Sequence, residues 1–211
     1  MFYDKKKGSL LNYIQLPLNV ITPYGTYLGV GYDGDIPNYI LSNSRVKTFE
    51  VKNSSFSKLS KDYIIINNKP LLKMKDSKIG YGYNVTATEI RNAYITVANK
   101  RIPIETETIT VSLANLILEK QLRNIGNVLE KFVFTKLGQP QFDALLIYFF
   151  YEGVDKIEND IIIEMINEEK WFDITDELQT NIRKTNGRVD EASAKLRMDI
   201  SRIWSYVPGY S

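Results

Sequence analysis

The most apolar stretch of the chain, residues 141–152, has the pattern of a buried α-helix. Large side chains recur in it at intervals of three and four residues, the spacing that places them on one helical face. The remaining positions are mostly apolar or aromatic as well, and a helix that is apolar on all sides is normally buried. Pro140 suits the first turn of such a helix, and Gly153 can end it. The pattern therefore predicts a central core helix, with almost fully buried side chains at Phe142, Leu146 and Phe149.

Several other helices are predicted around this core, each from a capping residue followed by helical periodicity. Thr110 is placed to cap a long helix. The buried stripe of that helix is expected at Leu118, Leu122, Ile125 and Leu129. Later helices are predicted to begin at Asn159 or Asp160, near residue 173 after Trp171 and Phe172, and at Asp190 or Glu191. An earlier helix is predicted over residues 35–52, where Asp35 is a plausible N-cap.

Short runs of β-branched and aromatic residues predict a small sheet in the first half of the chain. Residues 63–66 and 70–74 flank Asn67-Asn68-Lys69, an arrangement typical of a β-hairpin, and residues 79–83 follow as a third strand. We expect residues 63–83 to form an antiparallel sheet with a turn at Asn67-Asn68. Together with the helices this predicts an α+β fold, in which a small antiparallel sheet adjoins a mainly helical lobe.

Residues 1–34 differ in pattern from the rest of the chain. They contain short extended runs separated by turn signals at Pro23-Tyr24-Gly25 and Asp33-Gly34. We interpret them as an N-terminal extension, which either packs on the rest of the protein or serves as a docking arm in a larger assembly. Residues 35–211 are then expected to form one domain, as the length of the chain suggests.

The composition narrows the possible chemistry. The 211 residues include no cysteine and no histidine, which excludes disulfides, Ser-His-Asp catalysis and histidine-ligated zinc. A hydrolase built from this chain must use carboxylates, hydroxyls or amines. The net charge of +2 gives no reason to expect nucleic acid as a partner. Polar residues interrupt the apolar run near the start, so we expect a soluble protein with no signal peptide and no membrane span.

Four segments resemble motifs of the phage-type lysozymes, glycoside hydrolase family twenty-four, and they occur in the family's order. The core segment Gln139–Leu145, with Gly153 after it, resembles the family's Q-x-Q-F-D-A-L motif and its following glycine. Lys78–Tyr83 resembles the T-I-G-Y-G-H strand, and Ile109–Ala114 resembles the start of the next helix. Ala194–Arg197, with Trp204 after it, resembles the closing helix. The resemblance implies a lysozyme-like fold over residues 78–204.

The resemblance also implies an active site, and here the sequence departs from the family. The family has a glutamic acid, an aspartate nine residues later, and a threonine just before the I-G-x-G strand. No such pair of carboxylates precedes Ile79. In one alignment Glu50 is the acid and Asp62 the second carboxylate. In the other, Asp76 matches the aspartate, and the acid has become Asn67.

Two further positions of the family motif are also changed. Lys78 replaces the threonine, and Tyr83 replaces the histidine that commonly ends the strand motif. A lysine beside a catalytic carboxylate lowers its pKa, which opposes the raised pKa of a general acid. If Glu50 is the acid, we expect it to lie partly buried in the cleft, with Asp62 or Asp76 roughly 5–9.5 Å away. Tyr81 and Tyr83 are the candidate substrate-binding residues, because tyrosines can stack on sugar rings.

Two functions follow from the resemblance. The first is a peptidoglycan muramidase, acting as an endolysin or as a tail-associated wall-degrading enzyme, with bacterial peptidoglycan as substrate and no cofactor or metal. The second is a catalytically inactive, lysozyme-fold structural subunit of a phage tail or baseplate, which contacts other virion proteins through residues 1–34. We expect the protein either in the host cytoplasm before lysis or in the virion tail.

Overall fold

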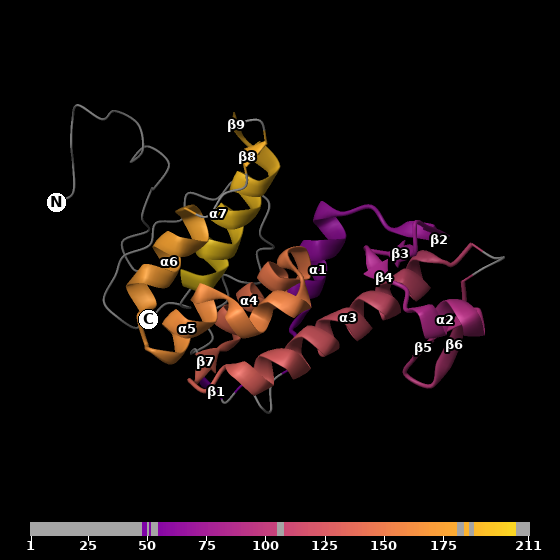
Figure 1. Ribbon diagram of the computed structural model, residues 1–211, viewed down its shortest axis with the longest axis horizontal. Helices are drawn as coiled ribbons and strands as arrows, with labels where there is room; N and C mark the ends of the chain where they lie inside the picture. The colour runs from indigo at the N-terminus through magenta and orange to yellow at the C-terminus, as the bar shows by residue number, and fades with distance from the viewer. Residues whose placement is uncertain are drawn as a thin grey trace.

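The computed structural model describes residues 48–49, 51, 55–104, 108–180, 184–185 and 188–205. The long helix α3 (Val111–Phe132) joins two parts of the molecule (Figure 1). The strands of residues 71–103 and the small helix α2 lie around one end of α3, and the other helices and strands lie toward its opposite end. Before α3 the chain forms β1 (Thr48–Phe49), α1 (Lys58–Asn67), β2 (Leu71–Lys75), β3 (Lys78–Gly80), β4 (Tyr83–Asn84), α2 (Ala87–Asn92), β5 (Tyr94–Val97) and β6 (Lys100–Pro103). After α3 it forms β7 (Leu137–Gly138), α4 (Gln139–Glu152), the 3-10 helix η4 (Val154–Asn159), α5 (Ile161–Asn167), α6 (Trp171–Thr180), β8 (Lys184–Thr185), β9 (Arg188–Val189) and α7 (Glu191–Ser205).

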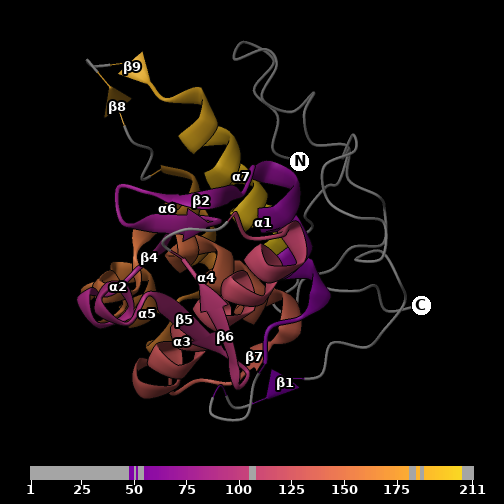
Figure 2. The same cartoon turned by 90° about the vertical axis from the view of Figure 1, so that its right-hand side faces the viewer.

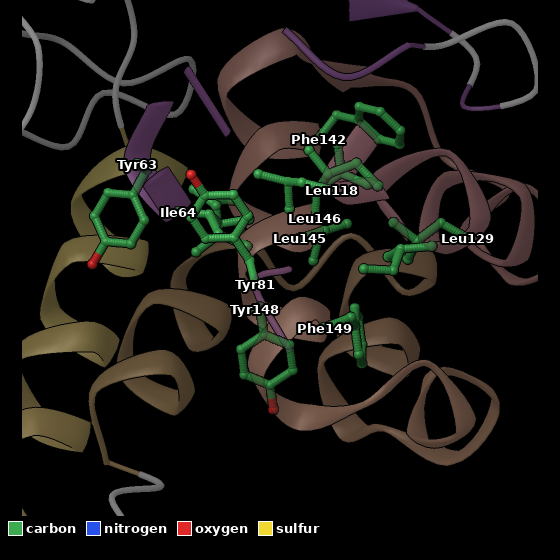
Figure 3. Packing of buried hydrophobic residues seen from close by; sticks show 14 of the residues in the cluster. Tyr63, Ile64, Tyr81, Leu118, Leu129, Phe142, Leu145, Leu146, Tyr148 and Phe149 are labelled. Carbon is green, nitrogen blue, oxygen red and sulfur yellow. The ribbon is translucent and has the colours of Figure 1, made fainter. Parts of the chain in front are cut away.

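Helix α4 forms the centre of the core, as predicted. Phe142 and Phe149 are 1% exposed and Leu146 is fully buried. Figure 3 shows these side chains packed with Leu118 and Leu129 of α3. The stripe predicted on α3 is buried along its whole length, and Thr110 caps that helix by accepting a hydrogen bond from the backbone N–H of Leu113.

Strands β2, β3 and β4 form an antiparallel sheet in that order. A two-residue turn joins β2 to β3, and both of its residues, Asp76 and Ser77, have positive φ angles of 50° and 58°. This is the backbone of a type I′ turn, whose twist matches that of the paired strands. Leu72 and Met74 of β2 pack against the core, while the residues that alternate with them, Leu71, Lys73 and Lys75, are exposed.

The prediction of a strand at residues 63–66, with a turn at Asn67-Asn68, is wrong. These residues lie in helix α1, and the hairpin turn falls nine residues later. Ser57 caps α1 by accepting from the N–H of Leu59, and one face of the helix, including Tyr63 and Ile64, is buried. Burial of that face outweighs the weak strand preference of three consecutive isoleucines. The predicted third strand is also divided into β3 and β4.

Part of the prediction for residues 35–52 is wrong as well. Thr48 and Phe49 are not helical but form β1, which pairs with Gly138 and Leu137 immediately before α4. Residues 35–47 lie outside the described part of the chain, as does the proposed N-terminal arm, residues 1–34. Residues 87–103 form α2 and the β5–β6 hairpin. Pro103 is tolerated at the end of β6, because this sheet has only two strands and both are edges.

The helices predicted after α4 are confirmed, with small differences at their ends. Asp160 caps α5 through the N–H of Ile162, and α6 begins at Trp171. Helix α7 begins at Glu191, directly after Asp190. Among the described residues, every helix is too short or too polar to cross a lipid bilayer.

Candidate functional site

Two hollows lie beside the C-terminal end of α4. The smaller, of about 380 Å³, lies between the ends of α1 and α4 and the start of α7, and its lining includes Asn67 and Glu152. The larger, of about 600 Å³ and here called the larger groove, lies between β4, α3 and the last residues of α4. Its lining includes Tyr83 and Phe150. Both hollows are therefore built around the residues that follow the buried core of α4.

Helix α1 runs alongside α4 and delivers two asparagines to the smaller hollow. At its start, the N–H and the hydroxyl of Ser57 donate to the Asp143 carboxylate at 3.0 and 2.6 Å. At its end, the amide of Asn68 donates to the hydroxyl oxygen of Tyr151 at 2.6 Å. The side-chain amide of Asn67 donates to the backbone carbonyl of Tyr63 at 2.9 Å, and Asn67 is itself exposed.

A buried ion pair lies next to these asparagines. Nη2 of Arg197 on α7 donates to Oε1 of Glu152 at 3.0 Å, and the two side chains are only 4% and 11% exposed. Lys156 binds the other carboxylate oxygen of Glu152 at 2.9 Å. The Arg197 guanidinium also lies 4.3 Å from the centre of the Tyr148 ring. Glu152 thus pairs with two cations, one on α7 and one after α4, which suits a structural anchor.

The larger groove is bordered by a hydrogen-bonded cluster that connects the small sheet to α3. Glu89 accepts hydrogen bonds from Lys120 at 2.6 Å, from the Tyr83 hydroxyl at 2.9 Å and from the backbone and hydroxyl of Thr86. Burial alone would raise the pKa of Glu89, but these hydrogen bonds outweigh it and lower the pKa. Glu89 is therefore an ionised tether between α2 and α3, and sequence reasoning did not identify it. The capping sequence Thr86–Glu89 was the available signal.

The structure places Asp62 and Asp76, two of the three proposed carboxylates, apart from the two hollows. Asp62 lies in the middle of α1, with Oδ2 3.8 Å from Nζ of Lys58. Asp76 is exposed in the β2–β3 turn. Neither residue lines the smaller or the larger hollow. Glu50 lies outside the described residues, and its neighbour Phe49 pairs with Leu137 at the opposite end of α4 from Asn67.

The two candidate sugar-binding tyrosines have different environments. Tyr81 is 6% exposed, and its hydroxyl donates to Oδ1 of Asn115 at 2.9 Å, so its ring belongs to the core (Figure 3). Tyr83 is half-buried and lines the larger groove, with Nζ of Lys120 5.0 Å from the centre of its ring. Of the two, Tyr83 keeps the solvent-accessible surface that contact with a ligand requires.

Among the described residues, the carboxyl group with a raised pKa belongs to Asp143, which lines neither hollow. Burial raises the pKa of Asp143, against the lowering effect of hydrogen bonds from Ser57, Ser60 and Gln139. Asp143 lies nine residues before Glu152 on α4, a separation of roughly 13–14 Å along the helix axis. It holds the start of α1 against α4, which is a structural role. Within the described residues, no group of three acidic side chains could hold a metal ion.

Several proteins of known structure have a fold similar to that of this chain. Three of them have TM-scores of 0.54–0.56. A mutant of P22 lysozyme is 16% identical, and the alignment covers 72% of this chain and 98% of that one, with a TM-score of 0.55. The muramidase domain of SpmX from Asticaccaulis excentricus is 18% identical, with coverages of 73% and 99% and a TM-score of 0.56. The endolysin of the Escherichia coli phage FAHEc1 is 19% identical, with coverages of 72% and 94% and a TM-score of 0.54.

At these identities the structural similarity shows the fold alone, an α+β lysozyme-like fold. Comparison with curated protein sequences gives no match. The model of the phage lysozyme family, in contrast, matches residues 71–197. This match begins at β2, covers more than half of the chain and ends within α7. The chain therefore belongs to the phage lysozyme family.

Proposed function

We propose that this chain is a phage lysozyme relative that binds peptidoglycan without cleaving it, and that it serves as a structural subunit of a phage tail or baseplate. The observation that carries the proposal is the position of Asn67. It is the last residue of α1, nine residues before Asp76, and β2 and β3 follow directly. In the family pattern the glutamic acid stands at this position relative to the aspartate. An asparagine amide has no titrating proton to give to a leaving group.

The lining of the larger groove supports the binding part of the proposal. Four residues with side-chain amides, Asn84, Gln121, Asn124 and Asn127, line it together with Tyr83. Amides both donate and accept hydrogen bonds, which suits the hydroxyl and N-acetyl groups of a neutral glycan. An aromatic ring at the edge of the groove offers a stacking surface for a sugar.

Muramidase activity is the second candidate, and membership of the family is the observation that favours it. It requires Glu50 as the general acid, because the family position at Asn67 cannot supply one. The two candidates differ in one measurable way, which is whether purified protein releases sugar fragments from peptidoglycan and whether Glu50 is needed for that release.

The test uses purified peptidoglycan and four forms of the protein: wild type, Glu50→Gln, Asn67→Glu, and Asn67→Glu combined with Lys78→Thr. We expect the wild type to co-sediment with the polymer without cleaving it, and Glu50→Gln to behave identically. The double variant restores the acid and removes the lysine at the family's threonine position, so we expect it to gain cleavage. Cleavage by the wild type that disappears in Glu50→Gln would establish the muramidase candidate instead.

A further inference from the structure

The β2–β3 hairpin presents a row of lysines on its outward side. Lys73 and Lys75 are exposed on β2, where they alternate with the core-facing Leu72 and Met74. Lys78, the first residue of β3, lies directly opposite Lys75 in the strand register and is exposed as well. β2 is an edge strand of its sheet, and the hairpin runs outside the helices in Figure 2. The outward side is thus accessible along its length.

The described residues provide no salt-bridge partner for the positive charge on this side. Lys69, Lys73, Lys75 and Lys78 are all exposed, and within the described part of the chain no carboxylate forms a salt bridge with any of them. The nearest acidic residue in sequence is Asp76, exposed at the tip of the turn. Like charges directly opposite each other on paired strands are destabilising. A face that keeps the pair Lys75 and Lys78 opposed therefore calls for an anionic partner.

We propose that Lys69, Lys73, Lys75 and Lys78, here named the hairpin lysine face, bind a linear phosphodiester polymer of the bacterial cell wall. Alternate residues of a strand lie roughly 6.6–6.8 Å apart, so Lys73 and Lys75 follow each other along β2 and Lys78 lies opposite Lys75, which offers several closely spaced point charges to an extended chain. Lysine binds phosphate as a mobile point charge without requiring a fixed geometry. Such a face suits a flexible polymer of repeating phosphates.

The composition of the hairpin lysine face favours this polymer over single-stranded nucleic acid and over an anionic membrane surface. Proteins that hold single-stranded nucleic acid place aromatic rings among the cations, and the exposed positions of β2 and β3 carry none. Surfaces that lie on membranes combine cations with large apolar groups. Here Leu71, at 38% exposure, is the single apolar side chain on the outward side of β2.

The proposed site is separate from the groove proposed to bind glycan. None of the four lysines lines the larger groove or the smaller hollow. A phosphodiester polymer on the hairpin and a glycan in the groove could therefore be held together. The inference goes beyond the function proposed above and does not depend on whether the chain cleaves peptidoglycan.

The experiment measures binding of the full chain to cell-wall sacculi that carry a poly(glycerol phosphate) polymer. Matched sacculi are treated with hydrofluoric acid, which removes the phosphodiester polymer and leaves peptidoglycan. The test variant is Lys75→Gln with Lys78→Gln. The control is Lys131→Gln with Lys136→Gln, which removes two exposed lysines at and beyond the opposite end of α3. Equilibrium unfolding of both variants shows that each is folded.

We expect the wild type to bind intact sacculi more tightly than stripped sacculi. The test variant should lose at least about tenfold in affinity for intact sacculi, given roughly fivefold per lysine at an anionic surface. The control variant should bind like the wild type. Binding to stripped sacculi measures the affinity of the larger groove for peptidoglycan alone. A failure of the glycan-binding proposal is therefore distinguishable from a failure of the proposal for the hairpin lysine face.

Three results would overturn the inference. One is equal binding of the wild type to intact and stripped sacculi. Another is an equal loss in the test and control variants, which would mean that only net charge matters. The third is binding of single-stranded DNA or anionic lipid vesicles as tight as that of poly(glycerol phosphate) and equally dependent on Lys75 and Lys78.

Discussion

The buried ion pair between Arg197 and Glu152 provides a sharp test of how the end of α4 is held. Glu152→Gln removes the negative charge but leaves the guanidinium in place. Arginine stays protonated inside proteins, so the side chain cannot escape by losing its charge. It is 3% exposed, and its Nη1 atom is buried without a hydrogen-bond partner in the described structure. The Tyr148 ring, 4.3 Å away, is then its main remaining support.

The structure predicts unequal costs for the two single substitutions. Breaking a buried ion pair from one side costs roughly 3–5 kcal/mol, and glutamine keeps an oxygen acceptor, so we expect about 3 kcal/mol for Glu152→Gln. Arg197→Met should cost less, about 1–2 kcal/mol, because Glu152 keeps its bond to Lys156 and methionine refills the space. The double substitution removes both charges and should be no less stable than Glu152→Gln alone.

Urea denaturation followed by circular dichroism measures these free energies of unfolding. A loss of 3 kcal/mol should also lower the melting temperature by roughly 6–12 °C for a chain of this size. Lys156→Gln is the control, because Lys156 is half-exposed and its ion pair should be worth about 0–1 kcal/mol. A loss below about 0.5 kcal/mol for Glu152→Gln, or strictly additive effects in the double variant, would refute the buried-charge argument.

Two further predictions concern the core and the small sheet. Phe149→Ala should lower the free energy of unfolding by roughly 3–5 kcal/mol, because Phe149 is 1% exposed at the centre of the core; a loss under 1 kcal/mol by urea denaturation would contradict that placement. Glu89 has a lowered pKa in the folded protein, so the stability it contributes is present above its unfolded pKa of about 4.3 and is lost as the pH falls through the folded value. The urea midpoint of the wild type should therefore fall more steeply below about pH 4.5 than that of Glu89→Gln, and parallel curves would show that its bonds to Lys120 and Tyr83 contribute no stability.

The sequence predicts those elements whose signals are local. Helices α3 and α4 follow from the spacing of their apolar residues and from Thr110, and both are confirmed. Helix α1 is not predicted, because Tyr63 and the three isoleucines after it have the composition of a strand. What stabilises α1 is distant in sequence. The Asp143 carboxylate that binds Ser57 at its start comes 86 residues later.

The candidate site likewise combines features with a local sequence signal and contacts between residues that are far apart in the sequence. The nine-residue spacing between Asn67 and Asp76 is visible in the sequence, and it acquires weight once α1 is seen to end at Asn67. The pair of Glu152 and Arg197 spans 45 residues, and no local pattern joins them. Tyr81 and Tyr83 are only two residues apart, yet one is buried and the other lines a groove. The difference arises from the turn between β3 and β4.

Asn67 also contributes to the stability of helix α1. Its amide donates a hydrogen bond to the carbonyl of Tyr63 in the last turn of α1. An ionised glutamate could not donate this bond, and its charge would face the negative end of the helix dipole. We therefore expect Asn67→Glu to lose about 1–2 kcal/mol of stability at pH 7, the sum of one hydrogen bond and one unfavourable dipole interaction.

The pH dependence distinguishes this explanation from a simple loss of packing. The same two effects disfavour the charged carboxylate, so they raise the folded pKa of the introduced glutamate above its unfolded value of about 4.3. Stability relative to the wild type should then be nearly restored below pH 4 and lost as the pH rises through the folded pKa. A raised pKa is also what a general acid needs, so the helix end that suits asparagine is the same environment that would activate a glutamate. Urea midpoints of Asn67→Glu and Asn67→Gln at several pH values test this, since a deficit that is constant with pH in Asn67→Glu would rule out the electrostatic cause.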